Sequence, residues 1–288
     1  MPLQPDLKAV NYESLQRIVT CDVRRRGVSD LCRAEFWENA VQLLVKASRI
    51  AVVTGFCIKK ANAPETDGPP GAVILGRALA RVGKSAALLT DSKNYSCLAA
   101  CSKSVKGPSV ILADDYEKIP ADIDLLVFVE RPGHATDGRY YDMRGADITD
   151  MAAPLDRAAE VFLKKGIPVL GIGDGGNEAG MGFLYDALSA KMPDYEQCLS
   201  RVAATVCLPV GISNWGAYAL AAALSVYYHR WLGLDYGEEG IMLSAMLDAG
   251  AVDGVTGRAD KSVDGISLSE LGEITLKIKN WHSEGFEI

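Results

Sequence analysis

The sequence predicts an α/β protein with three layers, in which a mostly parallel sheet carries helices on both faces in a Rossmann-like arrangement. Two observations support this prediction. Short apolar runs alternate along the chain with segments whose apolar residues recur every three or four positions, which is the pattern of strands joined by helices. Several of the runs are apolar throughout, as expected for strands buried on both faces of a parallel sheet.

Six strands are expected, and they cover residues 49–56, 85–91, 109–114, 124–133, 167–176 and 204–211. Helices are expected where apolar residues keep helical spacing, at residues 36–48, 71–83, 152–165 and 215–231. The apolar run in the last of these falls short of the ~20 residues that span a bilayer, which favours a buried core helix. No repeat or linker divides the chain, so a single domain over residues 1–288 is expected.

Charge and cysteine usage argue against several kinds of partner. The formal net charge of −7 disfavours a nucleic-acid-binding surface, which needs a basic stripe, and an anionic membrane surface. The first ten residues lack the charged start and apolar run of a signal peptide. The seven cysteines form no CxxC pair, and their odd number is typical of a reducing compartment. A cytoplasmic location is therefore expected.

Acidic residues follow several of the expected strands. Ligands of open α/β sheets bind at the carboxyl ends of the strands, and Asp91, Glu130 and Asp174 stand directly after strands there. Asp67 lies in the run PETDGPPGA, before an expected helix whose first amides are unpaired. Capping of that helix is an equally good interpretation of Asp67. The pattern predicts that these acids meet at one edge of the sheet.

The segment GIGDGGNEAGMG, residues 171–182, is the strongest functional signal. It matches G-x-G-x-x-G, but Asp174 and Glu178 would place negative charge where the pyrophosphate of a dinucleotide lies. Six glycines in twelve residues indicate a backbone pressed against a ligand. The better interpretation is a loop that presents hard oxygen ligands to Mg²⁺ or Mn²⁺. The predicted ligands of this divalent cation are Glu130, Asp174, Asn177, Glu178 and Asp67.

A long charged loop follows the fourth expected strand and has the sequence VERPGHATDGRYYDMRGADIT. Loops of this length and charge are more often functional than plain connections, although a solvated loop with internal ion pairs stays open. Its arginines, Arg131, Arg139 and Arg144, could bind a substrate carboxylate through paired hydrogen bonds. Asp137 and Glu178 are the candidates for catalytic acid–base chemistry.

Weaker signals complete the candidate set. Asn214 stands at the start of the long apolar helix, where it either caps that helix or contacts the substrate. The Asp-Gly pairs at residues 253–254 and 264–265 fit ordinary turns, because Asp caps a turn and Gly adopts a positive φ. The three histidines show no metal-binding spacing, so zinc is not expected.

The same loops carry a family resemblance. The runs PETDGPPGA, VERPG, DGRYYDMRGADIT, GIGDGGNEAGMG and SNWGAYAL resemble the D-glutamate cyclase-like family, which comprises the C-terminal domain of mitochondrial D-glutamate cyclase and its free-standing prokaryotic relatives. The resemblance covers residues 18–281 and implies a carbon–oxygen lyase that closes D-glutamate to 5-oxo-D-proline with loss of water. The mitochondrial enzyme has a further N-terminal domain. The expected partners are therefore a separate N-terminal-domain protein or further copies of this chain in a homo-oligomer.

Two other classes of function fit the same residues. Clustered carboxylates with Mg²⁺ or Mn²⁺ and arginines suit a phosphohydrolase in which water is the nucleophile. A non-catalytic module that binds a small acid or a partner domain is the third class. The favoured hypothesis is a D-glutamate cyclase-like enzyme that acts on D-glutamate, or on a related small anionic substrate, at an acidic site assisted by a divalent cation.

Overall fold

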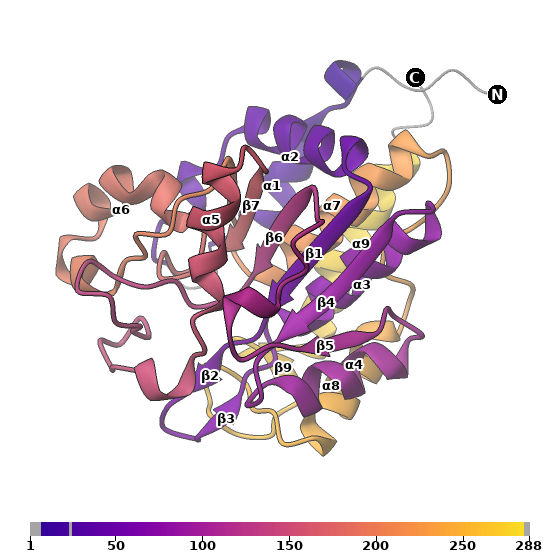
Figure 1. Ribbon diagram of the computed structural model, residues 1–288. Helices are drawn as coiled ribbons and strands as arrows, with labels where there is room; N and C mark the ends of the chain where they lie inside the picture. Colours follow the sequence, from indigo (N-terminus) through magenta and orange to yellow (C-terminus); the bar gives the residue numbers. More distant parts are fainter. Residues whose placement is uncertain (1–6, 23–24, 285–288) are drawn as a thin grey trace.

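One six-stranded sheet forms the centre of the protein (Figure 1). The computed structural model describes residues 7–22 and 25–284, so part of the segment used in the signal-peptide argument lies outside it. The strands are β1 (Arg49–Thr54), β4 (Ser85–Thr90), β5 (Val110–Leu112), β6 (Leu125–Val129), β7 (Val169–Gly173) and β8 (Val206–Pro209). Their order is β5-β4-β1-β6-β7-β8, and every neighbouring pair is parallel. The predicted fold class is confirmed.

The apolar runs of the sequence correspond to strands with a separate core on each face. β6 and β7 are buried at every position. In β6, Leu125, Val127 and Val129 belong to the larger core, whereas Leu126 and Phe128 belong to the smaller one. Successive side chains of a strand point to opposite faces, so a strand between two cores has to be apolar throughout.

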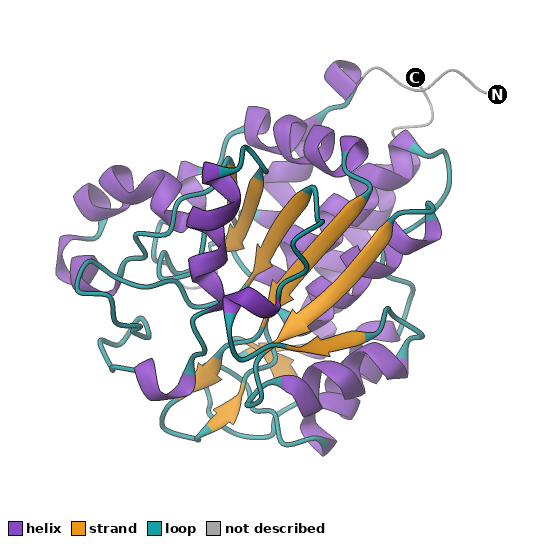
Figure 2. Ribbon diagram, in the orientation of Figure 1, coloured by secondary structure: helices purple, strands orange, loops and turns teal. Residues whose placement is uncertain are grey.

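Two helical layers of unequal size cover the sheet, whose strand arrows all point the same way in Figure 2. The larger layer contains α2 (Ala34–Lys46), α3 (Pro69–Arg81), α7 (Ser213–Tyr227) and α9 (Leu268–Glu284). The smaller layer, on the opposite face, contains α5 (Ala158–Lys164). α7 is buried along nearly its whole length, as predicted for a core helix. Within the part of the chain that the structure describes, no helix is long and apolar enough to cross a membrane.

Several helices were not expected from the sequence. Besides α9, they are α1 (Tyr12–Val19), α4 (Tyr95–Ser104), α6 (Tyr185–Lys191) and α8 (Glu238–Asp248). α4 and α8 have weak local apolar patterns, and packing against the rest of the protein supplies most of the stability of such helices. α1, by contrast, buries Tyr12, Leu15 and Val19 at helical spacing, a pattern that is visible in the sequence. The expected helix at residues 152–165 is shorter, since 3₁₀ turns precede α5. Pro154 lies among these turns, where its fixed φ and missing N–H disfavour a continuous helix.

A buried carboxyl group lies between two helices of the larger layer. Glu239 in α8 is 4% exposed, and its Oε1 accepts a hydrogen bond from the hydroxyl group of Tyr218 in α7 at 3.2 Å. Its Oε2 has no hydrogen-bond partner among the described residues. Burial, opposed by the hydrogen bond from Tyr218, raises the pKa of Glu239 from 4.5 to about 7.

We expect protein stability to depend on the ionisation of Glu239. Between pH 4.5 and about 7 the group is protonated in the folded state but ionised in the unfolded state. Its contribution to stability is therefore fully present below that window, decreases across it and stays low above it. Glu239→Gln removes the charge and keeps the shape. At pH 8 this variant should be more stable than the wild type by about 3 kcal/mol, because each pKa unit between 4.5 and about 7 corresponds to about 1.4 kcal/mol.

Urea unfolding at pH 5 and at pH 8 measures this difference. The advantage of Glu239→Gln should shrink at pH 5, where most of the penalty on the wild type has not yet developed. An advantage of equal size at both pH values would contradict the assigned titration.

Candidate functional site

The candidate site lies at the carboxyl edge of the sheet, where the connections diverge. β1 connects to β4 on one side, whereas its other neighbour, β6, connects onward to β7. Loops that leave such a point open a crevice between them, which is the usual ligand site of open α/β sheets. The loop after β1 contains a short hairpin of β2 (Cys57–Ile58) and β3 (Ala63–Pro64), seen beyond the strand ends in Figure 1.

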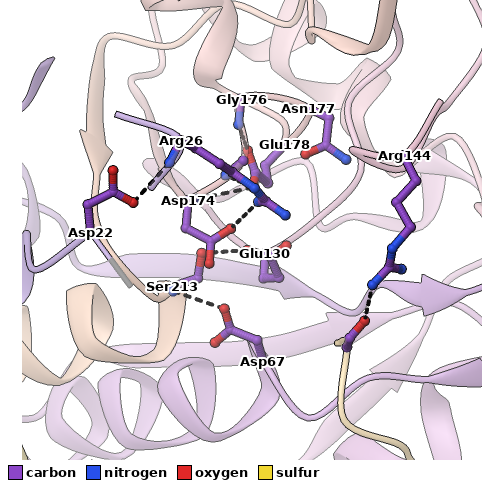
Figure 3. Close-up of polar contacts among 12 residues, drawn as sticks. Asp22, Arg26, Asp67, Glu130, Arg144, Asp174, Gly176, Asn177, Glu178 and Ser213 are labelled. Carbon is purple, nitrogen blue, oxygen red and sulfur yellow. Dashed lines mark hydrogen bonds and ion pairs between the residues drawn. The ribbon is translucent and has the colours of Figure 1, made fainter. Parts of the chain in front are cut away.

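The structure brings the predicted cation ligands together from three loops. Glu130 follows β6, Asp174 and Glu178 follow β7, and Asp67 precedes α3. All four side chains are buried, and Figure 3 shows them gathered around Asp174. Asn177 is also buried, and it lines a cavity beside these carboxylates.

Helices α3 and α7 cap each other at this edge. The carboxylate of Asp67 accepts the backbone N–H groups of Ser213 at 3.0 Å and Asn214 at 2.9 Å, in the first turn of α7. In return, Asn214 Oδ1 accepts the N–H groups of Gly68 at 3.0 Å and Gly71 at 2.8 Å, at the start of α3. Each side chain satisfies amides that a helix leaves unpaired. Asn214 therefore caps the neighbouring helix, not its own.

Glu130 has an uncommon backbone conformation. Its φ is 45°, in the left-handed region that costs a non-glycine residue about 1–3 kcal/mol. The chain leaves the sheet here, which is why the expected strand at residues 124–133 ends early. Ser213 Oγ donates a hydrogen bond to Glu130 Oε2 at 2.5 Å. Gly68 makes room for this arrangement, because a Cβ there would lie 2.6 Å from the Cβ of Glu130.

The glycine-rich loop wraps around the carboxylate of Glu178. Glu178 Oε1 accepts the N–H groups of Asp174 at 3.1 Å and Gly175 at 2.6 Å, and Oε2 accepts that of Gly176 at 2.7 Å. A Cβ on Gly173 would come within 2.7 Å of the same carboxylate. At Gly173, therefore, glycine accommodates a side chain of its own loop, which is an alternative to the expected contact between backbone and ligand.

The carboxylates of the site repel one another in a nearly dry environment. Burial, together with repulsion from Glu178 and Asp174, raises the pKa of Glu130 well above its usual range. Burial and repulsion from Asp264 and Asp67 have the same effect on the pKa of Asp174. Burial and Asp264 also raise the pKa of Asp67 to about 8, against its three backbone hydrogen bonds. A positive ion among these groups would relieve the repulsion.

One buried carboxylate oxygen of the cluster has no hydrogen-bond partner in the described chain. Asp174 Oδ1 lies 3.5 Å from Nη1 of Arg26, but Asp174 Oδ2 is buried without a donor. A buried acceptor left unpaired costs about 1–3 kcal/mol. Two trios of carboxylates around it place ligand atoms within 4.8 Å of one another: a first trio of Glu130, Asp174 and Glu178, and a second trio of Asp67, Asp174 and Asp264. Each trio could hold a metal ion.

A cavity of about 50 Å³ opens onto these carboxylates. Phe56, Ile58 and Met143 supply its apolar wall. Its charged lining consists of six acids and two arginines, which are Glu65, Glu130, Asp142, Asp174, Glu178 and Asp264, with Arg26 and Arg144. The site is therefore strongly acidic, with positive charge at two positions.

Four of these charged lining residues were not predicted, namely Glu65, Asp142, Asp264 and Arg26. Asp264 was interpreted as part of an ordinary turn. Its backbone does have a positive φ of 56°, but its carboxylate is also a member of the second trio. Arg26 comes from a segment before the first strand, and no local pattern connects it with the sheet edge. Glu65 had a usable signal, because an acid two residues before Asp67 is not needed for helix capping.

The three predicted arginines lie in different environments. Arg144 lines the cavity. Arg131 is fully buried and pairs with Asp91 at 2.6 Å, so the structure does not bring it to the cavity. Arg139 is exposed on the long loop, where it pairs with Asp147 at 2.9 Å. Of the three, Arg144 alone is in a position to meet a ligand of the acidic cluster.

Asp137, a predicted catalytic residue, lies on the exposed surface of the long loop. Its Oδ2 accepts a hydrogen bond from the hydroxyl group of Tyr141 at 2.6 Å, and its Oδ1 accepts the N–H of Arg139 at 3.0 Å. The hydrogen bond from Tyr141 lowers the pKa of Asp137, which makes it a weaker base. The structure does not bring Asp137 to the cavity, and this part of the loop fits the alternative of a solvated segment with internal pairs.

Comparisons with known proteins agree with the resemblance noted in the sequence. Residues 15–279 match the D-glutamate cyclase-like, C-terminal family. The chain is 32% identical over 241 residues to the mitochondrial D-glutamate cyclase of Homo sapiens, and the match covers 74% of this chain and 38% of that enzyme. The chain thus spans less than half the length of this relative.

A solved structure of an exopolyphosphatase-related protein from Bacteroides fragilis aligns with 87% of this chain and 58% of its own, at 8% identity and a TM-score of 0.43. A likeness of this size does not bear on function. The family match, by contrast, extends over most of the chain and includes every residue of the two carboxylate trios. The protein belongs to the D-glutamate cyclase-like, C-terminal family.

Proposed function

We propose that the protein is a D-glutamate cyclase-like enzyme that converts D-glutamate, or a closely related small acid, to 5-oxo-D-proline and water with the help of a divalent cation. Family membership supports the class of reaction, because the human relative is a D-glutamate cyclase. The observation that carries the cation is the buried carboxylate cluster around the unpartnered oxygen of Asp174.

The residues of the first trio fit Mg²⁺ or Mn²⁺. Their carboxylates, with the amide oxygen of Asn177 nearby, are the hard donors that these ions prefer. Hydrogen bonds from the loop backbone to Glu178 and from Ser213 to Glu130 orient two of the ligands in advance. A bound cation would polarise the carboxyl group of the substrate and stabilise the negative charge that develops on its oxygen.

Ring closure joins two groups of one substrate molecule. The amino nitrogen attacks the carbon of the side-chain carboxyl group, a C–N bond forms and a C–O bond breaks. One ammonium proton stays on the ring nitrogen, and two leave with the oxygen as water. The attacking amine must be neutral, so a base has to take a proton first. We assign this role to Glu65 in place of Asp137, because Glu65 lines the cavity and belongs to neither trio. Asp142 shares both properties, but its Oδ1 holds a turn of its own loop through the N–H groups of Arg144 and Ala146.

The two arginines of the lining bind the remaining carboxylate of the substrate. An acidic cavity repels an anion, so recognition of a dicarboxylate needs positive charge at its mouth. Arg26 and Arg144 lie on different sides of the carboxylate cluster in Figure 3. Guanidinium groups can donate two parallel hydrogen bonds to one carboxylate, which would fix the substrate with its amine toward Glu65.

The wider organisation is part of the same proposal. We assign residues 1–288 to a single domain that functions as a homo-oligomer or with a separate N-terminal-domain protein. The first test therefore uses the purified chain alone.

The purified protein, supplied with Mn²⁺ or Mg²⁺, should convert D-glutamate to 5-oxo-D-proline, and removal of the ion by EDTA should abolish turnover. Chiral chromatography of the product measures this, with L-glutamate and p-nitrophenyl phosphate as comparison substrates. Ion-dependent hydrolysis of the phosphate ester without lactam formation would instead support the phosphohydrolase. Binding of D-glutamate without turnover would support the non-catalytic module.

Asp174→Asn should weaken Mn²⁺ binding at least tenfold, since it removes a charge shared by both trios. An ion present at 100 times its Kd stabilises a folded protein by about 2.7 kcal/mol, and the variant should lose most of this gain in thermal unfolding. Without ions it should be no less stable than the wild type, because one repelling buried charge is gone. Asp137→Asn, an exposed acid outside the cavity, serves as the control. An undiminished Mn²⁺ effect in Asp174→Asn would exclude Asp174 as a ligand.

Arg144→Gln should raise the KM for D-glutamate by about 10-fold or more, because a hydrogen bond to a charged group contributes about 1.5–3 kcal/mol. Arg139→Gln is the matched control from the same loop, since its side chain lies outside the cavity lining. Steady-state kinetics of both variants give the comparison. Equal KM values for the two variants would remove Arg144 from the substrate site.

A further inference from the structure

We infer that the site holds two divalent cations, bridged by the carboxylate of Asp174. The inference rests on the proposed function, because the first ion is the one assigned above to Glu130, Asp174 and Glu178. The second ion is held by Asp67, Asp174 and Asp264.

The geometry of the two trios supports a shared centre. Within each trio the ligand atoms lie no more than 4.8 Å apart, and Asp174 is the member common to both. Two ions that share one bridging ligand in protein sites lie about 3.5–4 Å apart, which the two oxygens of one carboxylate can span. Asp174 Oδ2 has no donor in the described chain, and Oδ1 has only a long contact of 3.5 Å to Arg26. Both oxygens therefore keep lone pairs with which they could bind an ion.

Asp67, Glu178 and Glu130 keep capacity for an ion beside their hydrogen bonds. A carboxylate has about four lone-pair sites. Asp67 accepts three backbone N–H groups, and Glu178 also accepts three. Each retains one site, and the hydrogen bond from Ser213 to Glu130 engages Oε2 of that residue. The hydrogen bonds orient the carboxylates, and each of these residues has a ligand atom within 4.8 Å of one on Asp174.

Charge balance with all the lining acids ionised favours more than one cation. Six acids face two arginines in the cavity lining, which leaves four negative charges when all six acids are ionised. A single divalent ion would halve this excess, and an anionic substrate would still enter against repulsion. Two divalent ions would cancel it, so that the arginines and the ions together attract a dicarboxylate. Asp67, directly behind the lining, adds further negative charge.

Mn²⁺ alone is the probe for this inference. Native mass spectrometry and isothermal titration of the full chain should give two Mn²⁺ per chain, and the electron paramagnetic resonance spectrum should show two spin-coupled ions. Asp264→Asn should bind one Mn²⁺ with an uncoupled spectrum, and Glu130→Gln should lose the other ion. Asp142→Asn is the control and should still bind two, because Asp142 lines the cavity but belongs to neither trio. Its Oδ1 accepts the N–H groups of Arg144 and Ala146, which an asparagine also accepts.

The outcomes separate the two proposals. One Mn²⁺ per wild-type chain, unchanged in Asp264→Asn, overturns the second ion and leaves the single-cation function standing. Two ions without spin coupling overturn the bridging role of Asp174. No bound Mn²⁺ overturns both proposals. If Asp264→Asn fails to fold by circular dichroism, the stoichiometry and spectrum of the wild type still decide the question.

Discussion

The mutual capping of α3 and α7 is the contact on which the candidate site depends. Asp67 and Asn214 are 147 residues apart in the chain, yet each satisfies amides of the other's helix. α3 follows β1 and α7 follows β8, at the far edge of the sheet. The caps therefore hold the loop before α3 against the start of α7 at the carboxyl edge of the sheet. The position of Asp67 follows from backbone hydrogen bonds, so it does not need an ion to be maintained.

The same arrangement buries like charges together, and this costs stability at the candidate site. Burial of a carboxylate is tolerated only when hydrogen bonds or opposite charge compensate for lost hydration. Asp67 and Glu178 have backbone amides for this purpose, whereas Asp174 has little beside the distant Arg26. The large core on one face of the sheet includes nearly all of α7. Its burial stabilises the fold and offsets the cost of the buried carboxylates.

The sheet and part of the site could be predicted because both follow local rules. Apolar runs between two cores mark the strands, and the carboxyl-edge rule places Glu130 and Asp174 at the same rim. Asp264 and Arg26 could not be predicted in this way. They come from segments outside the strand–helix units that form the rim, and their positions depend on tertiary packing that no short pattern encodes.

Charged residues of one loop also look alike in sequence, although their environments differ. Arg131 is fully buried with Asp91, whereas Asp137 is exposed and bonded to Tyr141. Both residues were predicted to belong to the site. The charge of the loop suggested a functional role, but it could not show which way each side chain points. Asn214 was expected to cap its own helix or to contact the substrate, but it caps α3, which is contributed by another part of the chain.

The bonds between Glu178 and its own loop have a consequence for the choice of ion. A loop tied to its own carboxylate at three amides has little freedom to expand around a larger guest. Ca²⁺ takes six to eight oxygens at 2.3–2.6 Å in adaptable sites, whereas Mg²⁺ requires a compact octahedron at 2.0–2.1 Å. Under the proposed cation-assisted function, the stiffness of this loop should therefore favour small divalent ions over calcium.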